Sequence, residues 1–296
     1  MTAAVLSGKT LAQELRQSLK ETVSSLAQNG VVPGLAVVLL GDDPASSSYV
    51  LGKERTCREL GMRSFDHHLS AATSQAELLS LISQLNANPD VHGILVQLPL
   101  PQHINAQEIL QNINPDKDVD GFHPVSVGKM VLGEETFLPC TPFGILKLLE
   151  KAHVTLSGAE VVIVGRSNIV GKPLALLLMQ QPYNATVTVC HTKTKDLAVH
   201  LRRADIIIAA AGRPHTVTAE MVKPGACVID VGVNRIEDLT NPKGFRLIGD
   251  VDYDEVALLA SAITPVPGGV GPMTITMLMY NTVLSACRRH GIAFPL

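Results

Sequence analysis

The sequence predicts an α/β protein of two domains, and three observations support this fold class. The chain of 296 residues is long enough for two domains of ordinary size. Its composition is 46% hydrophobic but only 3% aromatic, so the core must be aliphatic, as in sheets that helices cover on both faces. Short apolar runs alternate with segments of helical spacing, which is typical of parallel sheets.

In the first half of the chain, two apolar runs predict buried strands and three other segments predict helices. Leucines and a valine recur at helical spacing from Leu11 to Leu26, and Gly30 can end that helix. The first apolar run leads into a Gly-Asp-Asp-Pro turn. In chain order, the expected elements are a helix over 11–26, a strand over 35–40, helices over 46–60 and 78–85, and a strand over 93–96.

The second half begins with an expected helix over 143–151, which Thr141 would cap and Pro142 would open. A strand over 161–164 then runs through a glycine-containing turn into a helix over 173–179. The remaining expected elements are strands over 186–189, 206–209 and 227–231, helical segments near 197–203 and 220–222, and a last helix over 274–289. This order is typical of nucleotide-binding domains, so we expect the second domain to be Rossmann-type.

Charge, cysteine and histidine patterns exclude several functional classes. The formal net charge is -3 without a basic stripe, so we expect no nucleic-acid partner. The five cysteines are scattered and form no CxxC pair, which indicates a reducing compartment. The histidines show no metal-ligand spacing, so we expect no metal. Without a signal core or an apolar run of about 20 residues, we expect a cytoplasmic protein with no membrane partner.

The turn over 165–173 predicts an anion site, because backbone N–H groups and the helix dipole favour phosphate at a helix N-terminus. The turn lacks the usual GxGxxG pattern, so this motif alone is weak. The next strand ends in hydroxyls and cations over 190–195, with no carboxylate before Asp196 to bind a ribose 2′-OH. With Arg166 nearby, a 2′-phosphate would suit this tip, so we expect NADP rather than NAD. The alternative is a solvated turn that happens to be basic.

Tyr49 and Lys53 are four residues apart on an expected helix, so they share one face. A phenol ring can stack on an aromatic ligand, and burial can lower the pKa of a lysine enough for it to act as a base. For such a pair in isolation, a surface tyrosine over a lysine stem is the better interpretation. The Tyr-x-x-x-Lys motif of short-chain dehydrogenases follows the cofactor loop, whereas this pair precedes Gly165, so that family is excluded.

Three loops carry further candidate ligand-binding groups. Gln97 begins a Gln-Leu-Pro-Leu-Pro segment whose first proline can be cis or can simply end the strand. The carboxylates over 116–122 lack the ligand ladder of an EF-hand, and one of them can instead pair with a guanidine-like ring edge, as in a pterin. The glycines over 264–272 permit close backbone approach to a ligand, although a rigid turn before the last helix is the alternative.

Together these segments closely resemble the bifunctional methylenetetrahydrofolate dehydrogenase/methenyltetrahydrofolate cyclohydrolase family over essentially the whole chain. The segments that carry the resemblance are 47–50 with Lys53, 93–101, 117–121, 139–142, 165–173 and 264–272. The resemblance implies oxidation of 5,10-methylenetetrahydrofolate with NADP, then hydrolysis to 10-formyltetrahydrofolate, in one-carbon folate metabolism. It also implies a homodimer. The alternatives are a relative with dehydrogenase activity only, or an NADP-dependent dehydrogenase of another small substrate.

The resemblance also implies a domain division and residue roles. Residues 1–142 would form a folate-binding catalytic domain completed by a C-terminal helix over 274–296, and residues 143–273 would form the NADP-binding domain, with a cleft between the two. Tyr49 would stack on the folate. Lys53 would be the key residue of the hydrolysis, with Gln97 hydrogen-bonded to it, and Asp120 would bind the pterin. Further folate contacts would come from Leu98, Pro265, Gly268 and Gly269. NADP contacts would come from Gly165, Arg166, Ser167, Val170, Gly171, Pro173, Cys190, His191, Thr192, Ala211, Gly212, Val231, Gly232 and Thr276.

Overall fold

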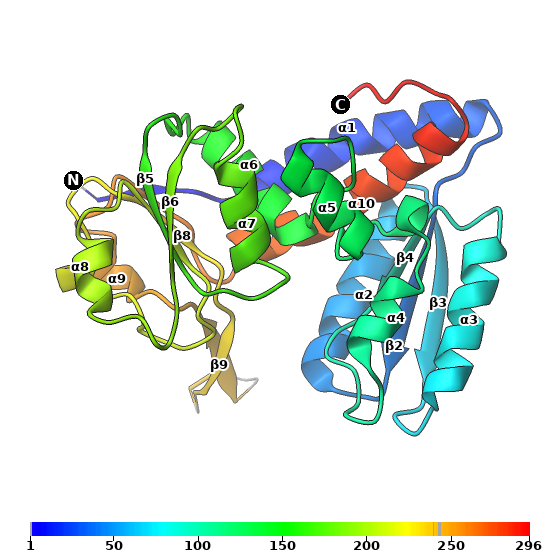
Figure 1. Cartoon of the computed structure of the whole chain (residues 1–296), viewed down its shortest axis with the longest axis horizontal. Coiled ribbons are helices and arrows are strands. Elements are labelled where there is room, and N and C mark those ends of the chain that lie inside the picture. Colours follow the sequence, from blue (N-terminus) through cyan, green and yellow to red (C-terminus); the bar gives the residue numbers. More distant parts are fainter. Residues whose placement is uncertain (1, 239, 242–243) are drawn as a thin grey trace. The chain divides into compact units, whose positions relative to one another are not determined.

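The computed structural model describes residues 2–238, 240–241 and 244–296, and it divides into two compact units (Figure 1). Unit 1 comprises the N-terminal segment up to Ala12 together with Thr141–Thr274, and unit 2 comprises Gln13–Cys140 and Ile275–Leu296. The main sheet of each unit is parallel and carries helices, so the predicted α/β class is confirmed. The cleft expected between the domains stays a prediction.

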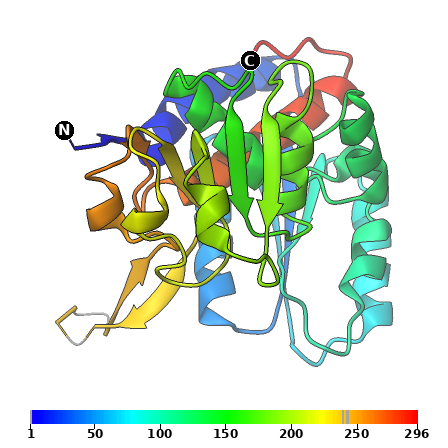
Figure 2. The same ribbon diagram turned by 60° about the vertical axis from the view of Figure 1, so that its left-hand side comes forward.

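Unit 1 contains a six-stranded parallel sheet in the order β1-β11-β8-β7-β5-β6. The strands are β1 (Ala4–Val5), β5 (Glu160–Val164), β6 (Thr186–Cys190), β7 (Ile206–Ala209), β8 (Cys227–Asp230) and β11 (Ala262–Ile263). Figure 2 shows β5 and β6 side by side in green. The chain passes from β5 to its neighbour β6 and then returns to β7, which pairs with the other side of β5. The β5/β7 boundary is therefore a topological switch point, where such folds bind ligands.

Short helices and a separate ribbon complete unit 1. They are α6 (Cys140–Lys151), α7 (Gly171–Leu178), α8 (Leu197–Leu201), the 3₁₀ turn η2 (Ala219–Met221), α9 (Tyr253–Val256) and the antiparallel pair β9 (Asn234–Glu237) and β10 (Phe245–Ile248). The N-terminal segment was expected with the first domain. It belongs to unit 1 because β1 pairs with β11, through Ala4 with Ala262 and Val5 with Ile263.

Unit 2 is built on a three-stranded parallel sheet in the order β3-β2-β4. The strands are β2 (Gly34–Leu40), β3 (Arg63–Leu69) and β4 (Gly93–Val96). Every residue of β2 and β4 is buried, because α2 and α3 lie on opposite sides of the sheet (Figure 1). The helices of unit 2 are α2 (Pro44–Glu59), α3 (Gln75–Ala87), α4 (Ala106–Gln111), η1 (Pro115–Lys117) and α5 (Pro124–Leu132). Two further helices, α1 (Gly8–Gln28) and α10 (Val270–Arg289), have their first turn in unit 1 and the rest of their length in unit 2.

The predicted strands are confirmed almost residue for residue, whereas several helix starts are wrong. α6 begins at Cys140, so Thr141 lies inside its first turn and does not cap it. α7 and α10 also begin earlier than expected, at Gly171 and Val270. Prolines in a first turn lose no intrahelical hydrogen bond, so they do not mark where these helices start. The segment expected as a helix near 220–222 is the 3₁₀ turn η2.

No helix within the described ranges is both long and apolar enough to cross a membrane.

Candidate active site

The lysine expected to drive the hydrolysis is held at the end of β4 in unit 2. α2 starts at Pro44, with the side chain of Asp43 accepting from the N–H of Ser46, and it carries both Tyr49 and Lys53 as predicted. Lys53 is only 7% exposed, whereas Tyr49 is 38% exposed. The geometry therefore combines an accessible phenol ring with a buried amine on a single helix.

Gln97 follows β4 and fixes the position of this amine. Lys53 Nζ donates to Gln97 Oε1 at 2.8 Å, and Gln97 Nε2 donates to the carbonyl of Leu98 at 2.7 Å. The second bond orients the amide, so that its oxygen faces the lysine. The structure thus brings Lys53 to the consecutive residues Gln97 and Leu98, which lie 44 or more positions later in the sequence. The Leu98–Pro99 peptide bond is cis.

Asp120 and Cys140 complete a buried ionisable cluster with Lys53. Burial lowers the pKa of Lys53, and the negative charge of Asp120 opposes this shift only in part. Burial raises the pKa of Asp120, and the positive charge of Lys53 opposes this shift. Burial likewise raises the pKa of the Cys140 thiol well above its usual range. At a given pH, a larger fraction of Lys53 is therefore in the neutral amine form than for a lysine in water, and a general base must be in that form.

Cys140 and Asn281 are members of this site that sequence reasoning did not identify. Cys140 Sγ donates to the carbonyl of Val119 at 3.3 Å, directly before Asp120. Asn281 Nδ2, on α10, donates to the same carbonyl at 2.8 Å and to that of Leu138 at 2.9 Å. Cys140 lay in a segment that carried the family resemblance, but no role followed from its residue type. Asn281 lies among apolar residues and gives no sequence signal.

The loop that presents Asp120 is folded around Asp118. The Asp118 carboxylate accepts from the N–H groups of Phe122 and His123 and from Ser126 Oγ, at 3.2, 2.8 and 2.7 Å. Burial raises the pKa of Asp118 to about 6, and these bonds oppose the shift. Because Asp118 is committed to its own loop, Asp120 is the carboxylate of this segment that stands beside Lys53.

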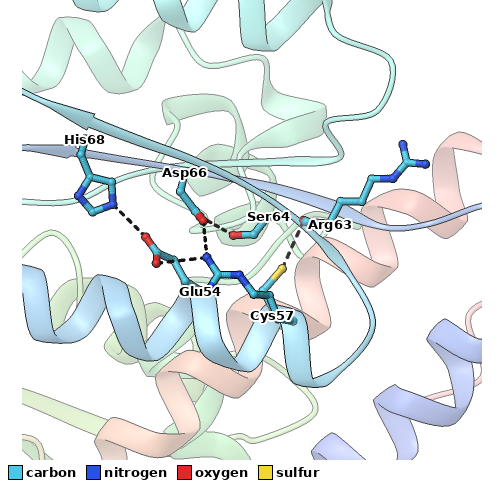
Figure 3. Close-up of polar contacts among 7 residues, drawn as sticks. Glu54, Cys57, Arg63, Ser64, Asp66 and His68 are labelled. Atoms are coloured by element: carbon cyan, nitrogen blue, oxygen red, sulfur yellow. Dashed lines mark hydrogen bonds and ion pairs between the residues drawn. The ribbon is translucent and has the colours of Figure 1, made fainter.

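α2 is fastened to β3 by a polar network on the side away from β4 (Figure 3). Glu54, the residue after Lys53, contacts His68 at 3.0 Å and Arg58 at 3.6 Å. Arg58 in turn pairs with Asp66 on β3 at 2.7 Å. Since Glu54 is almost fully buried, this network ties the helix that carries Lys53 to the sheet.

In unit 1, the turn between β5 and α7 needs both of its glycines. A Cβ on Gly165 would lie 2.1 Å from the carbonyl oxygen of Ala210, and Gly165 has φ +135°. A Cβ on Gly171 would lie 2.1 Å from the carbonyl oxygen of Gly165. Ser167 Oγ accepts from the N–H groups of Val170 and Gly171 at 3.1 and 3.4 Å. The glycines therefore let the turn pass close to the loop after β7, at the switch point, while Pro173 is buried in α7.

The tip after β6 is a tight turn that offers polar groups to solvent. The N–H of His191 donates to Thr194 Oγ1 at 2.9 Å, and the N–H of Lys193 donates to His191 Nδ1 at 3.1 Å. Cys190 is buried, whereas Thr192, Lys193 and Arg166 are exposed. Exposed hydroxyl and cationic groups at this tip fit the 2′-phosphate of NADP.

Two buried carboxylates hold the loops that follow β7 and β8. Asp250 Oδ2 accepts from the N–H groups of Ala211 and Gly212 at 2.6 and 2.8 Å. Asp230 Oδ1 accepts from the N–H groups of Gly232 and Asp250 at 3.0 and 2.9 Å. Burial raises the pKa of Asp230 to about 6. Both carboxylates were missed from the sequence, although they shape loops with four of the residues expected to contact NADP, including Val231.

The glycine-rich loop over 264–272 is fixed within unit 1. The N–H of Asp230 donates to Thr264 Oγ1 at 2.7 Å, and a Cβ on Gly269 would lie 2.6 Å from the carbonyl oxygen of Pro265. The N–H of Lys9 donates to the carbonyl of Gly268 at 2.9 Å. The loop is thus rigid, which agrees with both interpretations, and its contact with folate stays a prediction.

Thr276 differs from the other residues expected to contact NADP, because it lies in unit 2. It is fully buried, and its Oγ1 accepts from Arg16 Nε at 2.9 Å. Its role toward the cofactor stays a prediction.

Comparison with known proteins assigns the family. The model of the tetrahydrofolate dehydrogenase/cyclohydrolase catalytic domain matches residues 6–120, and the model of the NAD(P)-binding domain of the same enzymes matches residues 139–290. The chain belongs to this family. Its resemblance is therefore confirmed, and unit 1 contains most of the segment matched by the NAD(P)-binding model.

Individual relatives cover nearly the whole chain. The bifunctional protein FolD of Bacillus velezensis is 56% identical over 97% of this chain and 99% of its own. The FolD structure from Campylobacter jejuni is 50% identical with a TM-score of 0.92, over 97% of this chain and 99% of that one. The Trypanosoma brucei dehydrogenase-cyclohydrolase, solved with NADP cofactor and an inhibitor, is 39% identical with a TM-score of 0.94, over 99% of this chain and 100% of that one.

Proposed function

We propose that the chain oxidises 5,10-methylenetetrahydrofolate to 5,10-methenyltetrahydrofolate with NADP and then hydrolyses this product to 10-formyltetrahydrofolate, in one-carbon folate metabolism. One observation carries the proposal: a buried lysine of lowered pKa, Lys53, bonded to the amide of Gln97 and beside Asp120. Family membership and the two activities for which its relatives are named support it.

The oxidation requires the folate and the nicotinamide ring to be aligned, and it requires little proton transfer. NADP, when bound, accepts the hydride from the methylene bridge between N5 and N10, which leaves a cation shared by two nitrogens. No proton leaves in this step, so no acid–base group is required at the glycine turn over 165–173. Tyr49, partly exposed on α2, would stack on the folate, and such orientation contributes several orders of magnitude.

The hydrolysis moves protons and therefore needs a base. Water attacks the methenyl carbon, and the neutral Lys53 amine takes a proton from the attacking water as the C–O bond forms. The bond from this carbon to N5 then breaks, and its electron pair takes a proton at N5 from the Lys53 ammonium. The hydroxyl on the carbon loses its proton to solvent, so the formyl group stays on N10 and one proton is released overall. Gln97 holds the amine in place, and Asp120 binds the polar edge of the pterin.

The cofactor is held by residues of unit 1. The glycine turn with Arg166 and Ser167 would hold the phosphate groups of NADP, because a helix N-terminus with exposed backbone N–H groups favours phosphate. The exposed Thr192 and Lys193 recognise the 2′-phosphate, which favours NADP over NAD. The loops held by Asp230 and Asp250 line the same carboxyl end of the sheet.

The remaining parts of the proposal concern domains, assembly and location. Residues 1–142 with 274–296 act on folate, and residues 143–273 bind NADP. The enzyme works as a cytoplasmic homodimer without a nucleic-acid partner, as its acidic net charge and free, buried cysteines support.

One assay with two readouts tests the proposal. Purified enzyme is given 5,10-methylenetetrahydrofolate with NADP or with NAD, and both reduced cofactor and 10-formyltetrahydrofolate are quantified. We expect both products, with the higher kcat/KM for NADP. Cofactor reduction without formyl product would show a relative with dehydrogenase activity only. Absence of any reduction, together with turnover of another substrate such as shikimate, would overturn the proposed function.

A further inference from the structure

A cavity lies in unit 2 at the end of β4 opposite to Gln97. Its volume is about 350 Å³, and its lining includes three cationic side chains, Lys117, Arg288 and Arg289, one carboxylate, Asp116, and His92, which directly precedes β4. None of the lining residues belongs to the proposed folate site. The cavity is within the volume range of small-molecule sites.

His92 presents a buried donor at this cavity. The residue is 3% exposed, and its Nδ1 accepts from the N–H of Gly34 at 3.0 Å. Nδ1 therefore carries no proton, and the neutral ring holds its proton on Nε2. This Nε2 is buried and has no hydrogen-bond partner in the part of the chain that the structure describes. A buried N–H without an acceptor is unfavourable, so a ligand that offers an acceptor atom to Nε2 would be stabilised at this site.

The cationic side chains that line the cavity with His92 can donate hydrogen bonds to the same acceptor group. Lys117 Nζ donates to the carbonyls of Leu85 and Asn88 at 2.9 and 2.7 Å, which uses two of its three N–H groups and holds the ammonium in place. Arg289 forms no ion pair with the described residues. Burial chiefly lowers the pKa of His92 to about 4, and the positive charges of His290, Arg289 and Lys117 add to this shift, against the opposite effect of Asp90.

The helix dipole accounts for only part of this arrangement. Arg288 and Arg289 lie in the last turn of α10, where basic residues are favoured, and Arg288 already pairs with Glu135 at 2.5 Å. The dipole does not explain why the same cavity is lined by His92, whose imidazole has a buried N–H without a partner among the described residues, and by the buried Lys117. One cavity with several N–H donors and a single carboxylate is complementary to a multiply charged anion.

We propose that this cavity binds a small phosphate monoester, whose phosphate oxygens accept from His92 Nε2, Lys117 Nζ and the guanidinium of Arg289. The cavity is larger than a bare phosphate needs, so an organic part of the ligand fits beside it. Asp116 would accept from a hydroxyl of that part. The ligand is chemically distinct from folate, and the site does not depend on the proposed function.

The test measures phosphate binding to the whole enzyme with NADP present in excess, so that the glycine turn over 165–173 is already filled. The probes are inorganic phosphate and glycerol 3-phosphate, titrated at constant ionic strength against sodium chloride. Binding is followed by calorimetry and by the ¹⁵N resonance of His92 Nε2. We expect saturable binding of both probes, a shift of that resonance, and tighter binding of glycerol 3-phosphate.

Two cavity variants and one matched control make the test specific. Arg289→Gln removes an exposed charge, and His92→Asn keeps an acceptor for Gly34 while removing the Nε2–H donor. Each should weaken phosphate binding about tenfold or more, as the loss of a charge-assisted or buried hydrogen bond predicts. Arg55→Gln, an exposed arginine of the same unit outside the cavity, should bind like the wild type. The proposal is overturned if neither probe binds, or if Arg289→Gln, with unchanged circular dichroism, binds phosphate as tightly as Arg55→Gln does.

Discussion

Replacing Lys53 with methionine should separate the two activities of this enzyme. Methionine is close in length to the apolar stem of lysine, so it fits the 7% exposed position without a large cavity. What disappears is the amine that donates to Gln97 Oε1 at 2.8 Å and that serves as the base. Gln97 is half-buried and can turn to water, so the lost bond costs about 1 kcal/mol of folding stability.

The expected effect on rates follows from which step moves a proton. A positioned general base contributes about 10²- to 10⁴-fold, so the kcat of the hydrolysis should fall by that factor in Lys53→Met. The hydride step needs no base and depends on alignment, so dehydrogenase kcat should fall by about tenfold at most. In the wild type, the hydrolysis should accelerate with pH up to the Lys53 pKa, which burial places below 10.5, and then level off. The variant should lose this rise.

The assay follows reduced NADP and 10-formyltetrahydrofolate separately, for the wild type, Lys53→Met and Lys20→Met. Lys20 is an exposed lysine of α1, so Lys20→Met controls for the loss of one surface charge and should keep both activities. Equal rates of hydrolysis in Lys53→Met and the wild type would refute the role of the base. A parallel fall of both activities would instead indicate a structural role.

Three further predictions concern neighbouring charges. Asp120→Asn removes a charge that raises the pKa of Lys53, so the pH rise of the hydrolysis should move to lower pH and the folate KM should increase; steady-state profiles that stay in place would contradict this. Asp250→Asn replaces the acceptor of the Ala211 and Gly212 N–H groups and should raise the NADP KM roughly tenfold or more, with little change in the folate KM, as measured by initial rates. His92 should make the protein less stable as pH falls from 6.5 to about 4, because the unfolded chain binds the proton first; denaturant titrations should show about 3 kcal/mol of this loss in the wild type and not in His92→Asn.

The sequence predicted the buried framework well, because apolar runs have a strong pattern. Every residue of β2 and β4 is buried, and both strands coincide with predicted runs. The strand β3 was missed, since Arg63–Leu69 is largely polar and lies at the edge of its sheet. Its pairing with β2 is a tertiary interaction that no local pattern reveals. Helix starts were missed for the related reason that glycine and proline tolerate a first turn as well as a loop.

The candidate site was predicted as a set of residues but not as a set of interactions. Tyr49 and Lys53 were placed on one helix by spacing, and Lys53 does contact Gln97. The buried groups that organise both units were not found, because a carboxylate such as Asp230 has the same residue type whether it binds a ligand or accepts backbone N–H groups. Only the fold decides which, and here one N–H donor is the nearby Gly232 while another, Asp250, lies 20 residues away.

The choice of partner for Lys53 explains why burial can prepare it as a base. At 2.8 Å it meets a neutral amide oxygen, which accepts a hydrogen bond without a full negative charge. A carboxylate at that distance would favour the ammonium and oppose the effect of burial. Asp120 does carry such a charge, yet its influence on the lysine is weaker than that of burial, and its own pKa is raised as well. The cluster therefore holds Lys53 in place by a hydrogen bond and still lowers its pKa, which favours the neutral amine. Lys53 is thus positioned as the proton acceptor that the hydrolysis requires.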